Sequence, residues 1–232
     1  MTNGLKVKKR NGTIEPIDLE KMHKMVEAAT DGLAGVSASQ VEIQSGIQFY
    51  DGISTNEIQE ILIRSASDLI DLDHPNYQFV AARLLLFATR KSLYGRMKEL
   101  PHLVDHINSC VAAKVYDYGI YDAYSLEEIQ QADKWIDHER DFMFTYAGLR
   151  QVVDKYLVQD RSTGQVYETP QFMYMMIALT MFAKYPKDTR MEYVRRYYNA
   201  ISKHRINIPT PIMAGVRTPL RQFASCVLVD VD

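Results

Sequence analysis

Apolar and polar residues follow two different periods along the first hundred positions. Residues 5–17 alternate as in a hairpin that turns at Asn11-Gly12, and after residue 18 the apolar positions recur at helical spacing. Four helices are predicted, over 19–29, 38–50, 55–70 and 76–94. They open at residues favoured at helix starts, namely Asp18, Ser37, Ser54 and Pro75. A basic hairpin followed by four helices predicts a compact unit over residues 1–95.

Shorter helical segments follow. Helices are predicted over 102–113, from Ser125 onward and over 144–156, with a tyrosine-rich connector at 116–124 and a small hairpin at 156–167. Residues 170–183 are almost wholly apolar, which predicts a helix buried on all sides. A last helix over 186–201 should turn Tyr193, Val194 and Tyr197 toward the core. The apolar run 227–229 is typical of a buried strand, so a mainly helical protein with a strand at each end is predicted.

Composition excludes several classes of function. The 232 residues are 47% hydrophobic and 24% charged, with a net charge of −2, which argues against a protein devoted to nucleic acid or to an anionic membrane. The longest apolar run, 172–183, is about half the roughly 20 residues of a membrane span. The charged N-terminus lacks an export signal, and two cysteines give no disulfide framework. We therefore expect a cytoplasmic protein with neither a nucleic-acid nor a membrane partner.

The basic hairpin is the first candidate for chemistry. Lys9 and Arg10 beside a glycine turn are suited to phosphates, although lysines on a hairpin edge also serve to block edge-to-edge pairing. Lys91 could complete such a site or only complement the dipole of its helix. Thr55 is suited to cap a helix, to contact a base, or both. Neither a GxxxxGK[ST] loop nor a GxGxxG fingerprint is present in the sequence.

Cys226 is the second candidate. A lone cysteine at a strand start is usually a small buried hydrophobe, whereas redox chemistry needs a second sulfur whose Cα lies within roughly 7 Å. The other cysteine, Cys110, lies in an amphipathic helical segment. His102 and His106 are one helical turn apart, which is a weak signal for metal, and no metal site is predicted.

Sequence blocks along the chain resemble a known family. VKKRNGTIEPIDLEKMHKMV, DGISTNEIQEILIRSASDLI and YQFVAARLLLFATRKSLYG resemble the ATP-cone domain. INIPTPIMAGVRTPLRQFASCVL resembles the segment that enters the catalytic barrel of the class I ribonucleotide reductase large subunit, and WIDHERDFMFTYAG and KYLVQDRSTGQVYETPQF are similar to its helical region. The resemblance implies a mainly α fold: an ATP cone over 1–95, in which a small β sheet caps four helices, a helical domain over 96–220, and at 221–232 the incomplete first strand of a ten-stranded α/β barrel.

For the cone, the resemblance implies an effector site for ATP, which activates, and dATP, which inhibits. Gln59 stands where well-known relatives carry a histidine that modulates dATP inhibition. The residues implied at this site are Lys9, Arg10, Glu15, Pro16, Ile17, Asp18, Leu19, Glu20, Lys21, Thr55 and Lys91.

For the C-terminal block, the resemblance implies reduction of ribonucleoside diphosphates to deoxyribonucleoside diphosphates. Thr210 and Ser225 match positions that contact the substrate, and Cys226 matches one of the two thiols that reduce the ribose, which leaves Cys110 a structural role. The other catalytic residues of the family are expected beyond residue 232. The implied partners are a second chain with the rest of the barrel, a radical-generating small subunit that holds a dimetal cofactor, and thioredoxin or glutaredoxin.

Three interpretations remain open from the sequence. The chain is expected to be the N-terminal part of a split large subunit that assembles with a second polypeptide. A free-standing nucleotide sensor that regulates a partner without catalysis is the alternative. A fragment of an ordinary full-length subunit is the third.

Overall fold

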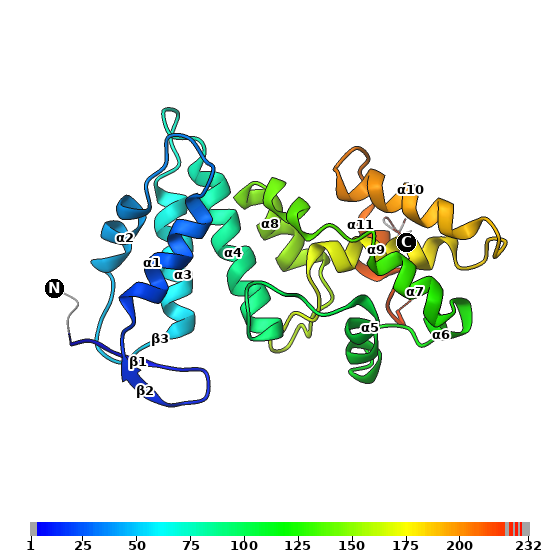
Figure 1. Ribbon diagram of the computed structural model, residues 1–232, viewed down its shortest axis with the longest axis horizontal. Coiled ribbons are helices and arrows are strands. Elements are labelled where there is room, and N and C mark those ends of the chain that lie inside the picture. Colours follow the sequence, from blue (N-terminus) through cyan, green and yellow to red (C-terminus); the bar gives the residue numbers. More distant parts are fainter. Residues whose placement is uncertain (1–3, 221–222, 225, 227, 229–232) are drawn as a thin grey trace, which may run out of the picture. The chain divides into compact units, whose positions relative to one another are not determined.

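The computed structural model describes residues 4–220, 223, 224, 226 and 228. These residues form two compact units (Figure 1). One contains the residues up to 92 together with 142–150, and the other contains 93–141 together with the residues from 151 onward. Within the described residues, no helix is both long and apolar enough to cross a membrane.

The first unit joins a small sheet to four helices, as predicted. β1 (Lys6–Lys8) pairs antiparallel with β2 (Ile14–Pro16), and Gly12 supplies the turn with a φ of +84°. A third strand that the sequence did not predict, β3 (Ile53–Ser54), pairs parallel with β1. The helices are α1 (Leu19–Thr30), α2 (Ala38–Gly46), α3 (Thr55–Asp68) and α4 (Tyr77–Tyr94).

Capping side chains fix where these helices begin. The Asp18 carboxylate accepts a hydrogen bond from the Lys21 backbone N–H at 3.0 Å. Ser54 and Glu57 form a reciprocal capping box at the start of α3, as predicted. The predicted extension of α2 to residue 50 was wrong, because the helix ends at Gly46 and Ile47 is 82% exposed, so no packing holds a further turn.

A segment distant in sequence completes the core of the first unit. The ring of Phe142 packs edge-on against Phe87, and the guanidinium groups of Arg83 and Arg90 lie over it at 5.3 Å and 5.6 Å. α8 (Tyr146–Gln151) begins just beyond it. These contacts place residues 142–150 with the first unit.

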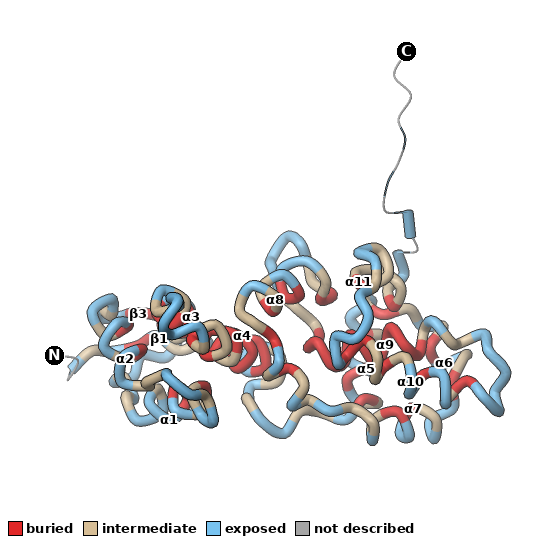
Figure 2. The backbone as a smooth tube through the Cα atoms, turned by 90° about the horizontal axis from the view of Figure 1, so that it is seen from above, coloured by how far each residue is buried: buried red, intermediate tan, exposed pale blue. Residues whose placement is uncertain are grey.

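The second unit is mainly helical and is organised around one buried helix. α9 (Pro170–Phe182) is buried continuously from Pro170 to Leu179, and Figure 2 shows this burial. The prediction of burial on all sides over 170–183 is confirmed up to Leu179 and is wrong for the last turn, where Met181 is 41% exposed. The other helices are α5 (Leu103–Ala112), α6 (Gly119–Ala123), α7 (Leu126–Asp133), a 3-10 turn (His138–Met143), a π turn (Val152–Tyr156), α10 (Arg190–Ser202) and α11 (Thr210–Gly215).

Three predictions for the chain after residue 143 need correction. The helix expected over 144–156 divides into α8 and the π turn. The hairpin expected over 156–167 is reduced to one antiparallel bridge, Gln159 to Val166. α10 begins at Arg190 rather than 186, and it buries Val194 and Tyr198 while Tyr193 stays 39% exposed. The expected strand over 227–229 lies outside the described residues except for Leu228.

Candidate functional site

Six of the residues expected at the effector site line one pocket of the first unit. The pocket has a volume of about 90 Å³ and is formed by the hairpin, the starts of α1 and α3, and the end of α4. The expected residues that line it are Lys9, Ile17, Asp18, Lys21, Thr55 and Lys91. Sites that enclose a small molecule usually measure roughly 300–1,000 Å³, so this pocket would enclose only part of a nucleotide.

Apolar side chains form the rest of the wall. Val7, Met22, Met25 and Ile58 line the pocket together with Gln59. The four apolar residues were not predicted at the site, although Met22 and Met25 fall on the face of α1 that its helical period turns inward. An apolar wall beside lysines is suited to a ligand with one apolar and one anionic end.

The electrostatics of the pocket favour an anion. Burial, followed by the positive charges of Arg10, Lys9 and Lys21, holds the pKa of Lys91 below its usual value. Only some of this charge is neutralised, since Lys9 contacts Glu15 at 3.3 Å and Lys21 contacts Asp18 at 3.0 Å. A phosphate group would supply the negative charge that favours the protonated form of Lys91.

Arg10 holds the site together from outside the pocket wall. Its guanidinium donates to the Asn56 side chain at 2.9 Å, to the Lys91 carbonyl at 2.8 Å and to the Gln59 side chain at 3.2 Å. It therefore ties the hairpin to α3 and to the end of α4. Gln59 points its amide oxygen at this guanidinium.

The remaining expected residues lie away from the pocket. Leu19 lines a larger pocket of about 800 Å³ with residues of α2, and Glu20 forms an ion pair with Lys24 at 2.6 Å. Glu15 and Pro16 lie on the exposed strand β2.

The second group of expected residues begins with Thr210 in α11. Thr210 is the first residue of this helix and is exposed, and its hydroxyl oxygen lies 3.3 Å from the Tyr156 hydroxyl. Cys226 is exposed and unbonded, whereas Ser225 lies outside the described residues.

Cys110 and His106 are buried, whereas His102 lies at the surface. Cys110 is buried, its thiol contacts the Tyr167 carbonyl at 3.5 Å, and burial raises its pKa to about 12. His106 is stacked on Phe172, while His102 contacts Asp133 at 2.8 Å. Over the described part of the chain, no cluster of three or more His, Cys, Asp or Glu side chains could hold a metal ion.

Two stretches of the chain match known domain families. Residues 5–92 match the ATP cone domain, and residues 142–221 match the all-alpha domain of ribonucleotide reductase. The chain carries an ATP cone and a ribonucleotide reductase all-alpha domain. It is homologous to an N-terminal portion of the ribonucleotide reductase alpha subunit, in agreement with the resemblance described above.

Individual relatives agree with this assignment. The chain is 50% identical, over 232 residues, to the ribonucleoside-diphosphate reductase subunit alpha of Haemophilus influenzae. It is 50% identical to ribonucleoside-diphosphate reductase 1 subunit alpha of Escherichia coli and 44% identical to subunit alpha of Enterobacteria phage T4. These matches cover 100%, 99% and 97% of the chain but only 31%, 30% and 30% of the relatives.

Proposed function

We propose that this ATP cone binds ATP and dATP, and that Thr210 of the all-alpha domain, with Ser225 and Cys226 that follow this domain, contributes substrate contacts and one thiol to ribonucleoside-diphosphate reduction. The observation that carries the proposal is the pocket of the first unit, where six expected residues meet. Burial, together with the neighbouring positive charges of Arg10, Lys9 and Lys21, lowers the pKa of Lys91, which supports an anionic ligand.

Each part of the pocket has a role toward the nucleotide. Lys9, Lys21 and Lys91 contact the phosphates, and the start of α3 at Thr55 adds the partial positive charge of its backbone amides. ATP and dATP differ by one hydroxyl group. A site discriminates between them where the loss of that hydroxyl leaves a buried polar group unpaired.

The proposed reaction consumes two thiols for each substrate. The 2′-hydroxyl of the ribonucleoside diphosphate leaves as water, the 2′-carbon gains hydrogen, and two thiols become a disulfide. Cys226 supplies one thiol, and Thr210 and Ser225 hold the substrate. The second thiol comes from the remaining part of the barrel, the radical from a small subunit with a dimetal cofactor, and the reducing equivalents from thioredoxin or glutaredoxin.

The decisive experiment assembles the chain with a polypeptide carrying the remaining barrel and with the small subunit. Cys226→Ser should abolish thioredoxin-coupled reduction of ribonucleoside diphosphates while ATP binding stays unchanged, because the cone is a separate unit. Cys110→Ala is the matched control, and it should retain turnover since that thiol is buried. Full turnover in the Cys226 variant would contradict the assigned role.

A nucleotide sensor without catalysis is the second candidate, and the compact first unit with its own core favours it. Deletion of residues 207–232 separates the two proposals. A sensor would keep its nucleotide-dependent effect on a partner after this deletion, whereas the reductase would lose all turnover.

A further inference from the structure

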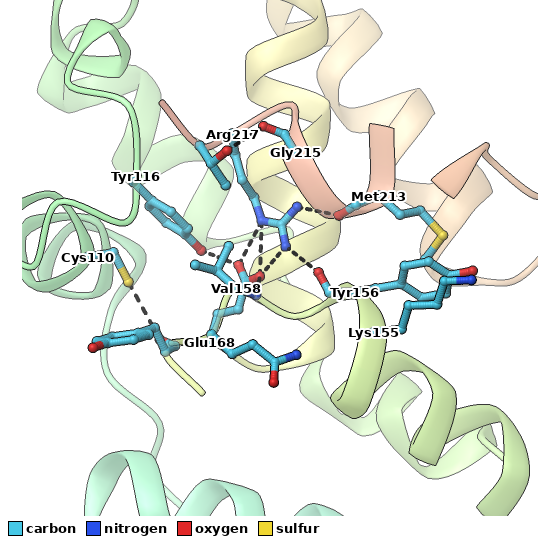
Figure 3. Close-up of polar contacts among 12 residues, drawn as sticks. Cys110, Tyr116, Lys155, Tyr156, Val158, Glu168, Met213, Gly215 and Arg217 are labelled. Carbon is cyan, nitrogen blue, oxygen red and sulfur yellow. Dashed lines mark hydrogen bonds and ion pairs between the residues drawn. The ribbon is translucent and has the colours of Figure 1, made fainter. Parts of the chain in front are cut away.

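A fully buried ion pair is in contact with α11. Arg217 and Glu168 have exposed side-chain fractions of 0% and 0%, although the two residues are 49 positions apart in the sequence. Neither residue has a role in the function proposed above. Figure 3 shows the guanidinium and the carboxylate facing each other at the centre of a polar network.

The guanidinium joins three segments of the second unit. Nε donates to Glu168 at 2.9 Å, Nη1 donates to the Met213 carbonyl at 2.5 Å, and Nη2 donates to the Tyr156 carbonyl at 3.0 Å as well as to Glu168. The carboxylate of Glu168 also accepts the Val158 backbone N–H at 2.7 Å and the Tyr116 hydroxyl. The ion pair is thus surrounded by partners that fix its geometry.

Two of these contacts hold the residues around Thr210. Met213 is three residues beyond Thr210 in the same short helix, and Tyr156 is the residue whose hydroxyl lies 3.3 Å from the Thr210 hydroxyl. One side chain therefore bonds to the backbone on both sides of the Tyr156–Thr210 contact. Because its guanidinium is a planar fork, Arg217 fixes the direction of both bonds at once.

Stability alone is a poor reason for this arrangement. A buried ion pair is often no more stabilising than apolar residues of similar volume, because both charges lose their hydration. α11 has six residues, too few to be stable by itself, so its position depends on what holds it. The described contacts of Arg217 supply that support at the carbonyl of Met213.

We propose that the Glu168–Arg217 ion pair is a positioning device for substrate binding, and that Tyr156 is a further positioning residue. The pair fixes the position of the Tyr156 backbone relative to α11, and the Tyr156 hydroxyl orients the Thr210 hydroxyl toward a ribonucleoside diphosphate. This inference rests on the proposed contact between Thr210 and the substrate.

Tyr156→Phe tests the inference in the assembled enzyme. Since one neutral hydrogen bond is removed, KM for the ribonucleoside diphosphate should rise roughly 3- to 10-fold, while kcat stays within about twofold. Tyr121→Phe is the matched control, because that hydroxyl also makes a hydrogen bond in the second unit, to Asn108 at 2.6 Å. An unchanged KM in Tyr156→Phe would overturn the inference.

A double variant, Glu168→Gln with Arg217→Met, tests the ion pair. It removes both charges together, so neither is left unpaired, and the amide oxygen that replaces a carboxylate oxygen can still accept hydrogen bonds. KM should rise about as much as in Tyr156→Phe, with the ATP affinity of the cone unchanged. A lower unfolding temperature with a wild-type KM would assign the pair to stability alone and overturn the inference. Absence of ribonucleotide reduction by the wild-type assembly would instead refute the proposed function itself.

Discussion

Replacement of Lys91 by methionine should weaken ATP binding without destabilising the cone. Methionine keeps most of the apolar stem of the side chain and removes the ammonium group, with its charge and its hydrogen-bond donors. The Lys91 carbonyl, which accepts the hydrogen bond of Arg10, is part of the backbone and stays in place. The variant therefore isolates the contribution of one charge to the pocket.

The expected loss of affinity follows from the geometry. A hydrogen bond between charged groups contributes about 1.5–3 kcal/mol, so the dissociation constant of ATP should rise roughly 10- to 150-fold. Although Lys91→Met should weaken ATP binding, it should not lower the stability of the fold. Burial and three neighbouring cations lower the pKa of Lys91, so the folded cone carries a penalty at every pH below that lowered pKa. Methionine removes the penalty, and the nucleotide-free variant should unfold at the same or a higher temperature.

Titration calorimetry with ATP and thermal unfolding without nucleotide measure the two effects. Lys24→Met is the matched control, because Lys24 is on the same unit but pairs with Glu20 away from the pocket. The reasoning is refuted if the Lys91 and Lys24 variants bind ATP within about twofold of each other, because one charge-assisted hydrogen bond is worth at least tenfold.

Three further predictions concern stability. Glu128→Gln should cost about 3 kcal/mol in urea unfolding because it leaves the buried Arg190 without its counter-ion, whereas the neighbouring exposed Glu127→Gln should cost little. Burial lowers the pKa of His106 from its ordinary value of 6.5 to about 4. Between pH 6.5 and pH 4 the imidazole is therefore protonated in the unfolded chain but not in the folded chain, and the free energy of unfolding should fall by about 3 kcal/mol over this range. His106→Asn should reduce this loss. Ser54→Ala should destabilise α3 by about 1 kcal/mol in thermal unfolding, and it should also weaken ATP binding because Thr55 lies next to the lost cap.

Local sequence signals were sufficient for most helix starts. Asp18, Ser54 and Ser125 cap their helices as predicted, because a cap depends on residues only three positions apart. The end of α2 was predicted too late, because helix length depends on tertiary packing, and Ile43 and Ile47 are 69% and 82% exposed.

Features that depend on distant residues were missed. β3 is two residues long and exists because it pairs with β1, so no pattern of its own could reveal it. The ion pair of Arg217 and Glu168 joins residues 49 positions apart, and an arginine or a glutamate considered alone is expected at the solvent-exposed surface. The basic hairpin already indicated Lys9, with Lys91 as a candidate to complete its site, and the resemblance added Lys21, whereas the apolar wall of that pocket needed the packed positions of α1 and α3.

The pocket of the cone also links ligand concentration to the stability of the folded domain. Its walls come from both ends of the first unit, from Val7 on the first strand to Lys91 in the last turn of α4, so they meet only when the whole unit has folded. A ligand that occupies it binds the native form alone and stabilises that form by mass action, by about 2.7 kcal/mol at a concentration 100 times its dissociation constant. Under the proposed function, a cell rich in ATP would hold more of this domain intact and out of reach of proteases than a starved one.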